Sequence, residues 1–352
     1  MRGWRGMLLG AGIAMMAIGQ PALAQGSVNA RVTAQAWADY KSKFLDPSGR
    51  IVDNANGNIS HSEGQGYGLL LAYLANSPAD FEQIWYFTRT ELLVRDDGLA
   101  VWKWDPATTP HVADVNNASD GDLLIAYALA LAGSAWNKSD YIEAAAKMAQ
   151  AILSQAVIAS GGRTLLLPGV KGFGAEDRKD GPVINPSYWI YEAIPVMAAL
   201  APSNAWQKLS DDGLSLLQAM QFGPRKLPAE WVSLRGQPRP ADGFDAEFGY
   251  NAIRIPLYLA RAGVSDKELL LRLSAGMTAN GDVPATIDLA SGKPKQLLTD
   301  VGYRVVNDVV ACVTKGTKLP ASSQQFAPSL YYPSTLQLLG LAFVGEKHPE
   351  CL

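Results

Sequence analysis

The sequence contains few of the residues that most often bind metals or form crosslinks. Its 352 residues include two cysteines, Cys312 and Cys351, and three histidines, His61, His111 and His348. Neither an HExxH nor a CxxC motif is present, so we expect no dedicated metal site. Two cysteines do not make a disulfide framework. An oxidising periplasm would allow them to pair, but the sequence does not show that they lie close enough, and we do not predict a disulfide.

An excess of positive charge and a membrane-length apolar segment are also absent. The formal net charge is −3, whereas proteins that bind nucleic acids usually present a basic surface, so we expect no nucleic-acid partner. No apolar stretch reaches the roughly 20 residues that a membrane helix needs. Hydrophobic residues nevertheless make up 48% of the chain, which is ample for a large core.

The first residues have the pattern of a secretory signal peptide. Arg2 and Arg5 precede an apolar core over residues 7–18, and the small residues 22–24 (Ala-Leu-Ala) precede Gln25. We therefore predict a signal peptide over residues 1–24 that is cleaved, with an uncleaved anchor as the alternative. The mature chain is expected to be periplasmic or secreted, without a membrane span.

Helical periodicity dominates the rest of the chain. Length alone would favour about two domains, but the composition does not shift, so we predict one all-α domain over residues 25–352. Segments such as 122–131 and 188–200 are apolar on nearly all faces, which indicates burial. Because such helices alternate with amphipathic ones and no fixed period repeats, we predict an inner and an outer ring of helices, an α/α barrel. The predicted helices cover residues 28–44, 62–74, 78–93, 119–133, 138–155, 187–200, 203–219, 250–262, 265–278, 300–315 and 334–345, with one short strand at 163–167.

Two predicted helices begin with nearly the same four residues. Residues 62–65 (Ser-Glu-Gly-Gln) and 119–122 (Ser-Asp-Gly-Asp) each combine a Ser cap, an acid, a Gly and a polar residue that would close a capping box. An ordinary capped helix with an exposed acid is the simple interpretation. The glycines at 64, 66 and 68 favour a binding site, because a backbone without side chains lets a ligand approach Glu63 closely.

Two further helix starts are polar. Residues 185–188 (Asn-Pro-Ser-Tyr) place Pro after an Asn cap, and residues 248–254 read Phe-Gly-Tyr-Asn-Ala-Ile-Arg. If these are inner helices of one barrel, the four starts surround a single mouth lined with carboxylates, amides and an arginine. Aromatic side chains near them suit the apolar faces of sugar rings, although core packing is the alternative for each. They are Tyr67, Trp102, Trp104, Tyr188, Trp189, Tyr250 and Trp231.

Two carboxyl groups across a sugar-binding cleft indicate glycoside hydrolysis, in which an acid and a base or nucleophile flank the bond that breaks. The acid must be protonated near neutral pH, yet a helix N-terminus favours the ionised form of Glu63. Burial or a neighbouring carboxylate must therefore raise its pKa. Asp120 is the obvious neighbour.

Taken in order, residues 62–68 (Ser-Glu-Gly-Gln-Gly-Tyr-Gly), 118–122 (Ala-Ser-Asp-Gly-Asp), 185–188 and 249–254 resemble glycoside hydrolase family 8. The resemblance runs from about Trp37 to the C-terminal helices and is strongest to the periplasmic endoglucanases that accompany bacterial cellulose synthase. It implies an (α/α)6 barrel and inverting endo-cleavage of β-1,4-glucan without a cofactor. It also implies a cellulose chain as partner and raises the cellulose synthase complex as a second one.

The resemblance assigns residue roles as well. Glu63 corresponds to the general acid, and Asp120 to a second catalytic carboxylate or a holder of the sugar at the cleavage point. The arginine that follows the family's base corresponds to Arg254. The substrate-binding residues that we predict are Tyr67, Trp102, Asp122, Tyr188, Tyr250, Asn251 and Arg254.

One position departs from the family pattern. Many relatives have Asp in the motif Tyr-Asp-Ala-Ile-Arg, where it activates water, whereas this chain has Asn251, which cannot serve as a base. The alternative candidates for the base are Asp120, Asp245 and Glu247. An inverting pair should lie about 6.5–9.5 Å apart.

Three other functions compete with an endoglucanase that edits cellulose during its synthesis. A family member could act instead on chitosan, xylan or mixed-linkage glucan. Asn251 also permits a weakly active or non-catalytic glucan-binding component of the synthase assembly. A polysaccharide lyase is the weakest of the three, because no paired His-Tyr site stands out.

Overall fold

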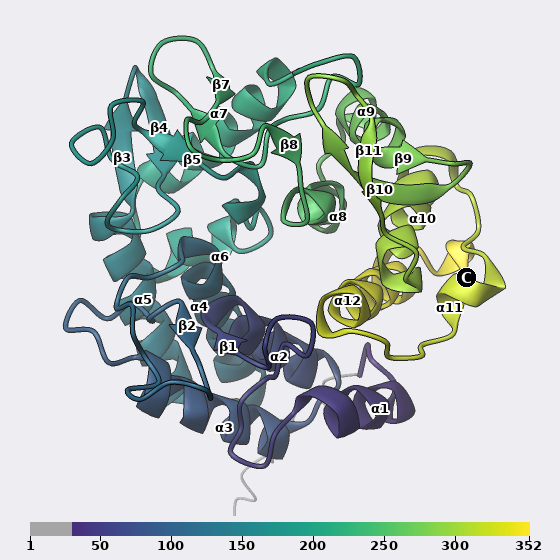
Figure 1. Cartoon of the computed structure of the whole chain (residues 1–352). Coiled ribbons are helices and arrows are strands. Elements are labelled where there is room, and N and C mark those ends of the chain that lie inside the picture. The colour runs from purple at the N-terminus through teal and green to yellow at the C-terminus, as the bar shows by residue number, and fades with distance from the viewer. Residues whose placement is uncertain (1–29) are drawn as a thin grey trace, which may run out of the picture.

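The computed structural model describes residues 30–352, which form twelve α-helices in two concentric rings (Figure 1). The even-numbered helices form the inner ring and the odd-numbered ones surround it, so the predicted (α/α)6 barrel is confirmed. The predicted signal peptide, residues 1–24, lies outside the described residues. The inner helices are α2 (Ser62–Leu74), α4 (Ser119–Trp136), α6 (Ile194–Leu200), α8 (Ile255–Arg261), α10 (Val301–Lys315) and α12 (Tyr331–Lys347). The outer helices are α1 (Ala34–Phe44), α3 (Pro78–Phe87), α5 (Ser139–Gln155), α7 (Ala205–Ala219), α9 (Lys267–Met277) and α11 (Ala321–Gln324).

The inner helices α2 and α4 pack unusually closely, and glycines permit it. A Cβ atom added at Gly66 would lie 2.5 Å from Cβ of Leu124, and one added at Gly121 would lie 2.1 Å from Oγ of Ser62. Gly68 faces Ile51 in the same way. Gly66 and Gly68 therefore serve packing and not, as predicted, ligand access to Glu63. Gly64 instead faces His61 and Tyr331, which line the cavity, so for Gly64 the prediction of ligand access stays a prediction.

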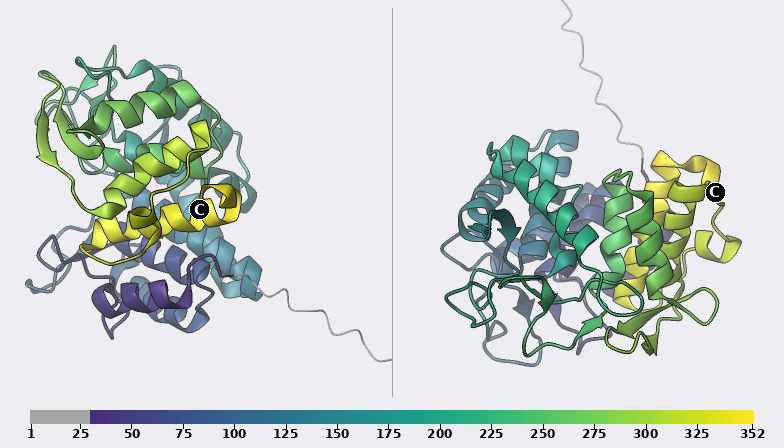
Figure 2. Two further views of the ribbon diagram at one scale, coloured as in Figure 1. Left: turned by 90° about the vertical axis from the view of Figure 1, so that its right-hand side faces the viewer. Right: turned by 90° about the horizontal axis from the view of Figure 1, so that it is seen from above.

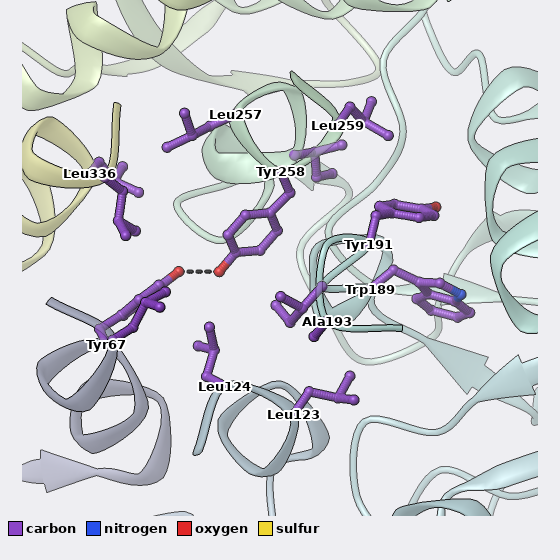
Figure 3. Packing of buried hydrophobic residues seen from close by; sticks show 14 of the residues in the cluster. Tyr67, Leu123, Leu124, Trp189, Tyr191, Ala193, Leu257, Tyr258, Leu259 and Leu336 are labelled. Carbon is purple, nitrogen blue, oxygen red and sulfur yellow. Dashed lines mark hydrogen bonds between the residues drawn. The ribbon is translucent and has the colours of Figure 1, made fainter. Parts of the chain in front are cut away.

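The barrel axis is filled with side chains from the inner helices. Tyr67 of α2 and Tyr258 of α8 point toward one another and join their hydroxyl groups (Figure 3). Apolar side chains such as Leu124 and Leu336 surround this pair, and all four residues are buried. The core therefore closes the barrel below the inner-helix starts.

Short antiparallel strands gather on one face of the barrel (Figure 2). The predicted strand at 163–167 is confirmed as β4, but the hairpin of β10 and β11 was not predicted. Residues 284–287 of β10 are all buried, so this segment lacks the alternation that marks a strand in sequence. The sheets are β1 (Ser60–His61) with β2 (Lys103–Trp104); β3 (Val157–Ser160) with β4 (Arg163–Leu166); β5 (Val183–Ile184), β6 (Val232–Ser233) and β7 (Arg239–Pro240); and β8 (Glu247–Phe248), β10 (Val283–Asp288) and β11 (Pro294–Leu297), with β9 (Thr278–Ala279) on β10.

Several helices differ from their predicted bounds. The predicted helix 187–200 begins only at Ile194, after a 3-10 turn over Pro186–Tyr188. The predicted helix 250–262 is a 3-10 turn over Ala252–Arg254 followed by α8. The predicted helix 78–93 is α3 followed by a π-helix over Thr88–Leu92. The first helix starts at Ala34 and not within residues 30–33.

Cys312 of α10 and Cys351 of a C-terminal 3-10 turn (Pro349–Cys351) form a disulfide, with their Cα atoms 6.0 Å apart. The expectation that they do not pair is therefore wrong. The sequence could not reveal the pair, because α12 and the turn after it bring Cys351 back to α10 over a separation of 39 residues. Among the helices of residues 30–352, none is long and apolar enough to cross a membrane.

Candidate active site

A cavity of about 660 Å³ opens at the end of the barrel where the inner helices begin. Each inner helix contributes at least one lining residue at or just before its first turn. The prediction that the polar helix starts surround one mouth is thus confirmed. These residues are Glu63, Asp120, Tyr188, Asn251, Asp300 and Tyr331, for α2, α4, α6, α8, α10 and α12 in that order.

Arg254 joins the starts of α2 and α4 from the 3-10 turn before α8. Its Nη1 donates to Oε2 of Glu63, its Nη2 donates to Oδ2 of Asp120 at 2.5 Å, and its Nε donates to the carbonyl of Ser187 at 3.3 Å. Arg254 is fully buried, whereas the side chains of Glu63 and Asp120 are 15% and 2% exposed. One guanidinium therefore holds two carboxyl groups side by side, with only Glu63 partly open to the cavity.

The two carboxyl groups have pKa shifts in opposite directions. Burial opposes ionisation of Glu63, but the positive charge of Arg254 outweighs it and holds the pKa of Glu63 below its usual range. Burial raises the pKa of Asp120 to about 6, against the pull of Arg254 and with the help of the charge on Glu63. The prediction that Asp120 raises the pKa of Glu63 is therefore wrong for this structure. Of the two carboxyl groups, Asp120 is therefore the one whose protonated form the surroundings favour.

Neither of the two predicted capping boxes forms. The cap of α2 is His61, whose Nδ1 accepts a hydrogen bond from the backbone N–H of Gly64 at 3.0 Å. The Gln65 side chain turns instead to the backbone of Ile51 and the hydroxyl of Thr88. At α4 no side chain caps the helix, and Ser119 Oγ donates to a neighbouring carbonyl. Tertiary partners thus take over the side chains that a capping box would use.

His61 has a second contact that fixes its protonation. Because its Nδ1 accepts the bond from Gly64, the ring proton lies on Nε2, which is 3.4 Å from Oδ2 of Asp53. Burial lowers the pKa of His61, but the carboxylates of Asp53, Glu63 and Asp120 outweigh it and raise the pKa above its usual value. Neither Asp53 nor His61 was predicted to have a role in the site. His61 borders the signature motif, whereas Asp53 lies in a polar loop without any signal.

Aromatic side chains line the cavity beside the acids. Trp102, Tyr188 and Tyr250 were predicted to bind substrate, and all three lie at the cavity. Trp102 is held by a hydrogen bond from its Nε1 to Asp114 at 2.8 Å. Three lining tyrosines were not predicted, because they lie in the first turns of helices with ordinary apolar patterns. They are Tyr303, Tyr331 and Tyr332.

Three predicted substrate-binding residues do not line the cavity: Tyr67, Asp122 and Arg254, the last of which is fully buried and holds Glu63 and Asp120. Tyr67 is fully buried in the core against Tyr258 (Figure 3). Asp122 is fully buried below the mouth, where it accepts hydrogen bonds from the backbone of Ala100 and the side chain of Asn117, both at 2.8 Å. Burial raises the pKa of Asp122 to about 7. The remaining tryptophans near the helix starts, Trp104, Trp189 and Trp231, pack against protein side chains or backbone.

The candidates for a base are placed very differently. Asp120 lies beside Glu63 on the same arginine. Asp245 and Glu247 both bind Lys295, at 2.8 and 2.5 Å, and neither lines the cavity. Asn251 does line the cavity, and its backbone N–H donates to Oε1 of a buried carboxylate that sequence analysis missed, Glu230, at 2.6 Å.

The fold and the site together define a class of protein. Two carboxyl groups held side by side at a cavity lined with aromatic rings fit a glycoside hydrolase, which cleaves its substrate with a pair of carboxyl groups. The family model of glycosyl hydrolases family 8 matches residues 12–346, and the chain belongs to that family.

Relatives place the chain among the endoglucanases of the family. The "Probable endoglucanase" of Novacetimonas hansenii is 36% identical over 87% of this chain and 89% of its own length. The endoglucanase of Cellulomonas uda is 40% identical over 64% of this chain, and the match spans 62% of that protein.

Solved structures agree with this placement. Endoglucanase Cel10 of Klebsiella pneumoniae, a family 8 glycosyl hydrolase, has a TM-score of 0.81 and 35% identity, over 89% of this chain and all of that one. The endo-β-1,4-glucanase CMCax of Acetobacter xylinum has a TM-score of 0.80 and 34% identity, over 89% of this chain and 97% of that one.

Proposed function

We propose that the chain is an endo-β-1,4-glucanase that hydrolyses internal bonds of cellulose or a related glucan with inversion at the anomeric carbon. The observation that carries the proposal is the pair of carboxyl groups held by Arg254 at the mouth of an open, aromatic-lined cavity. Aromatic rings suit the flat faces of glucosyl units, and an open cavity suits cleavage within a chain. The endoglucanase names of the relatives point to the same substrate class.

Glu63 is the proposed general acid because both members of the pair line the cavity and its side chain, at 15% against 2% for Asp120, is the more exposed of the two. Its lowered pKa means that it does not hold the proton by itself. Asp120 retains that proton up to about pH 6. A sugar bound against Glu63 displaces water and raises the pKa of Glu63, so the proton passes from Asp120 to Glu63 and then to the leaving glucosyl oxygen.

Asp120 itself does not suit the role of the base. An inverting base and acid stand about 6.5–9.5 Å apart so that a water fits between them. Asp120 and Glu63 instead share one guanidinium. The proposed role of Asp120 is therefore to store the proton and to hold the sugar at the cleavage point.

The proposed setting is outside the cytoplasm, in the periplasm or secreted. The predicted signal peptide over residues 1–24 supports it, as does the Cys312–Cys351 disulfide, because disulfides persist in oxidising compartments. Editing of glucan during cellulose biosynthesis, with the cellulose synthase complex as partner, is the proposed biological role. It rests on the resemblance to endoglucanases of cellulose-producing bacteria.

Product analysis on cellopentaose tests the proposal. The wild-type protein should release shorter cello-oligosaccharides whose new reducing ends first appear in the α configuration, as followed by proton NMR. Glu63→Gln should lose about 10²–10⁴-fold in kcat, the usual contribution of a general acid, while still binding the oligosaccharide. Parallel incubations with chitosan and xylan oligosaccharides would expose a different substrate class. Wild-type protein without release from cellopentaose, or Glu63→Gln with a tenth of the wild-type rate, would contradict the proposal.

A further inference from the structure

The cavity contains a pair of residues whose chemistry the proposed acid leaves unused. Asn251 lines the cavity at the start of the 3-10 turn that also carries Arg254. Its backbone N–H donates to Oε1 of Glu230 at 2.6 Å. This hydrogen bond links Asn251 at the cavity surface to the buried carboxylate of Glu230.

Glu230 is built into its position. Only 9% of the residue is exposed, and its own N–H donates to the carbonyl of Glu247 at 2.8 Å. A Cβ atom added at Gly249 would lie 2.4 Å from Oε2 of Glu230, so the carboxylate lies directly against the backbone that leads to Asn251. Burial raises the pKa of Glu230, against the hydrogen bond from the backbone N–H of Asn251 that lowers it.

Glu230 differs from the other candidates in having no cation of its own. Glu63 and Asp120 bind Arg254, whereas Asp245 and Glu247 bind Lys295. Among residues 30–352, no Lys, Arg or His side chain forms an ion pair with Glu230. A buried carboxylate without a cation gains most from taking up a proton.

We propose that Asn251 and Glu230 act together as the base of the reaction, a role that rests on the proposed function. The attacking water forms its C–O bond to the anomeric carbon while its proton moves to Oδ1 of Asn251. An Nδ2 proton of the same amide moves to Glu230, which leaves Asn251 briefly as the imidic acid. The amide is restored when Glu230 returns a proton to Nδ2 and Oδ1 releases its proton to solvent. Glu63 separately gives its proton to the leaving oxygen.

Two further carboxyl groups line the cavity, those of Asp53 and Asp300. Asp53 faces His61, two residues from Glu63, and so lies on the side of the acid. An inverting base must approach the sugar from the opposite side. Asp300 also lines the cavity, at the start of α10, and is the rival that an experiment must separate from Glu230.

Four variants, assayed with wild type on cellopentaose, test the pair. Glu230→Gln should lower kcat by about 10²-fold or more, as expected for loss of a base, with KM within a few-fold of wild type. The double variant Glu230→Gln/Asn251→Asp should recover kcat to within about tenfold of wild type, because an Asp at 251 takes the water proton directly. Asn251→Ala should be as inactive as Glu230→Gln, and Asp300→Asn tests the rival. Thermal unfolding of each variant checks folding.

The rescue distinguishes chemistry from structure. A merely structural Glu230 would leave the double variant no more active than Glu230→Gln, and that result overturns the inference. So does a Glu230→Gln variant that retains more than a tenth of the wild-type kcat, or a loss seen in Asp300→Asn alone. If Glu230→Gln fails to fold, a fifth variant, Asn251→Asp, is compared with Asn251→Ala. Asn251→Asp should stay active and Asn251→Ala should not, and an equal loss of kcat in both overturns the inference. The endoglucanase proposal fails separately, when wild type itself releases nothing.

Discussion

The starts of α2 and α4 carry almost the same four residues but occupy different depths in the barrel. At α2, His61 caps the helix and the side chain of Glu63 is 15% exposed at the cavity. At α4, the first turn lies below the surface, and both Asp120 and Asp122 are buried. A local sequence pattern thus fixes which residue types begin a helix, whereas the packing of the helix decides whether the acid meets a ligand.

The same comparison explains the electrostatics. Glu63 and Asp120 share Arg254, yet only Asp120 has a raised pKa. Asp120 is the more deeply buried of the two, and its desolvation outweighs the attraction of the arginine, whereas at Glu63 the arginine outweighs desolvation. The deeper acid therefore stores a proton and the shallower one delivers it.

Removing Arg254, the cation that Glu63 and Asp120 share, should have the largest effect on stability and activity. Arg254→Leu leaves two buried carboxyl groups without a partner, which should lower the free energy of unfolding by about 3–5 kcal/mol and abolish activity. Urea unfolding at pH 7 measures the loss. At a pH below about 4 the loss should shrink, because both carboxyl groups can then be protonated.

Arg254→Lys is the matched control for that variant. It keeps a positive charge but not the two-nitrogen fork that reaches both acids. Its stability should lie between those of wild type and Arg254→Leu. A stability loss in Arg254→Leu that is the same at pH 4 and pH 7 would show that packing, and not charge, determines the effect.

Asp120→Asn should separate the stored proton from the delivered one. In wild type, kcat/KM should fall as the pH rises above about 6, when the pair loses its proton. In Asp120→Asn that limb should move to lower pH, because Glu63 alone has a lowered pKa. A profile of kcat/KM from pH 4 to 9 measures the shift, and an unmoved limb would contradict the assignment.

The stability of the two proteins gives an independent check. The folded-state pKa of Asp120 lies above its ordinary value of 3.8. The contribution of Asp120 to the free energy of unfolding is therefore fully present at low pH and is lost as the pH rises from about 4 to about 6. Asp120→Asn should lack this component of the pH dependence of unfolding.

The barrel and the two acids could be predicted from sequence because each has a local signal. Inner helices such as α2 and α4 are apolar on nearly all faces, and acids at their first turns stand out. The pKa shifts had no such signal, since they depend on Arg254, which is 191 residues from Glu63. Glu230 had none either, because it lies in the segment between α7 and β6 and acts through a contact with Asn251.

The two predicted capping boxes show most directly what the sequence could not reveal. Substitutions at the start of α2 also give the smallest change in stability that we predict. The sequence indicates Ser62 as the cap of α2, but in the structure Ser62 Oγ is buried without a hydrogen-bond partner among the described residues, while His61 accepts the bond from Gly64. Ser62→Ala should therefore leave the free energy of unfolding unchanged or slightly higher, because the buried hydroxyl has no hydrogen bond to lose. His61→Ala should lower it by about 1 kcal/mol, the usual cost of losing a cap, and His61→Asn should recover part of that loss because Asn caps well. Urea unfolding of the three variants measures the order, and a larger loss in Ser62→Ala than in His61→Ala would restore the capping box.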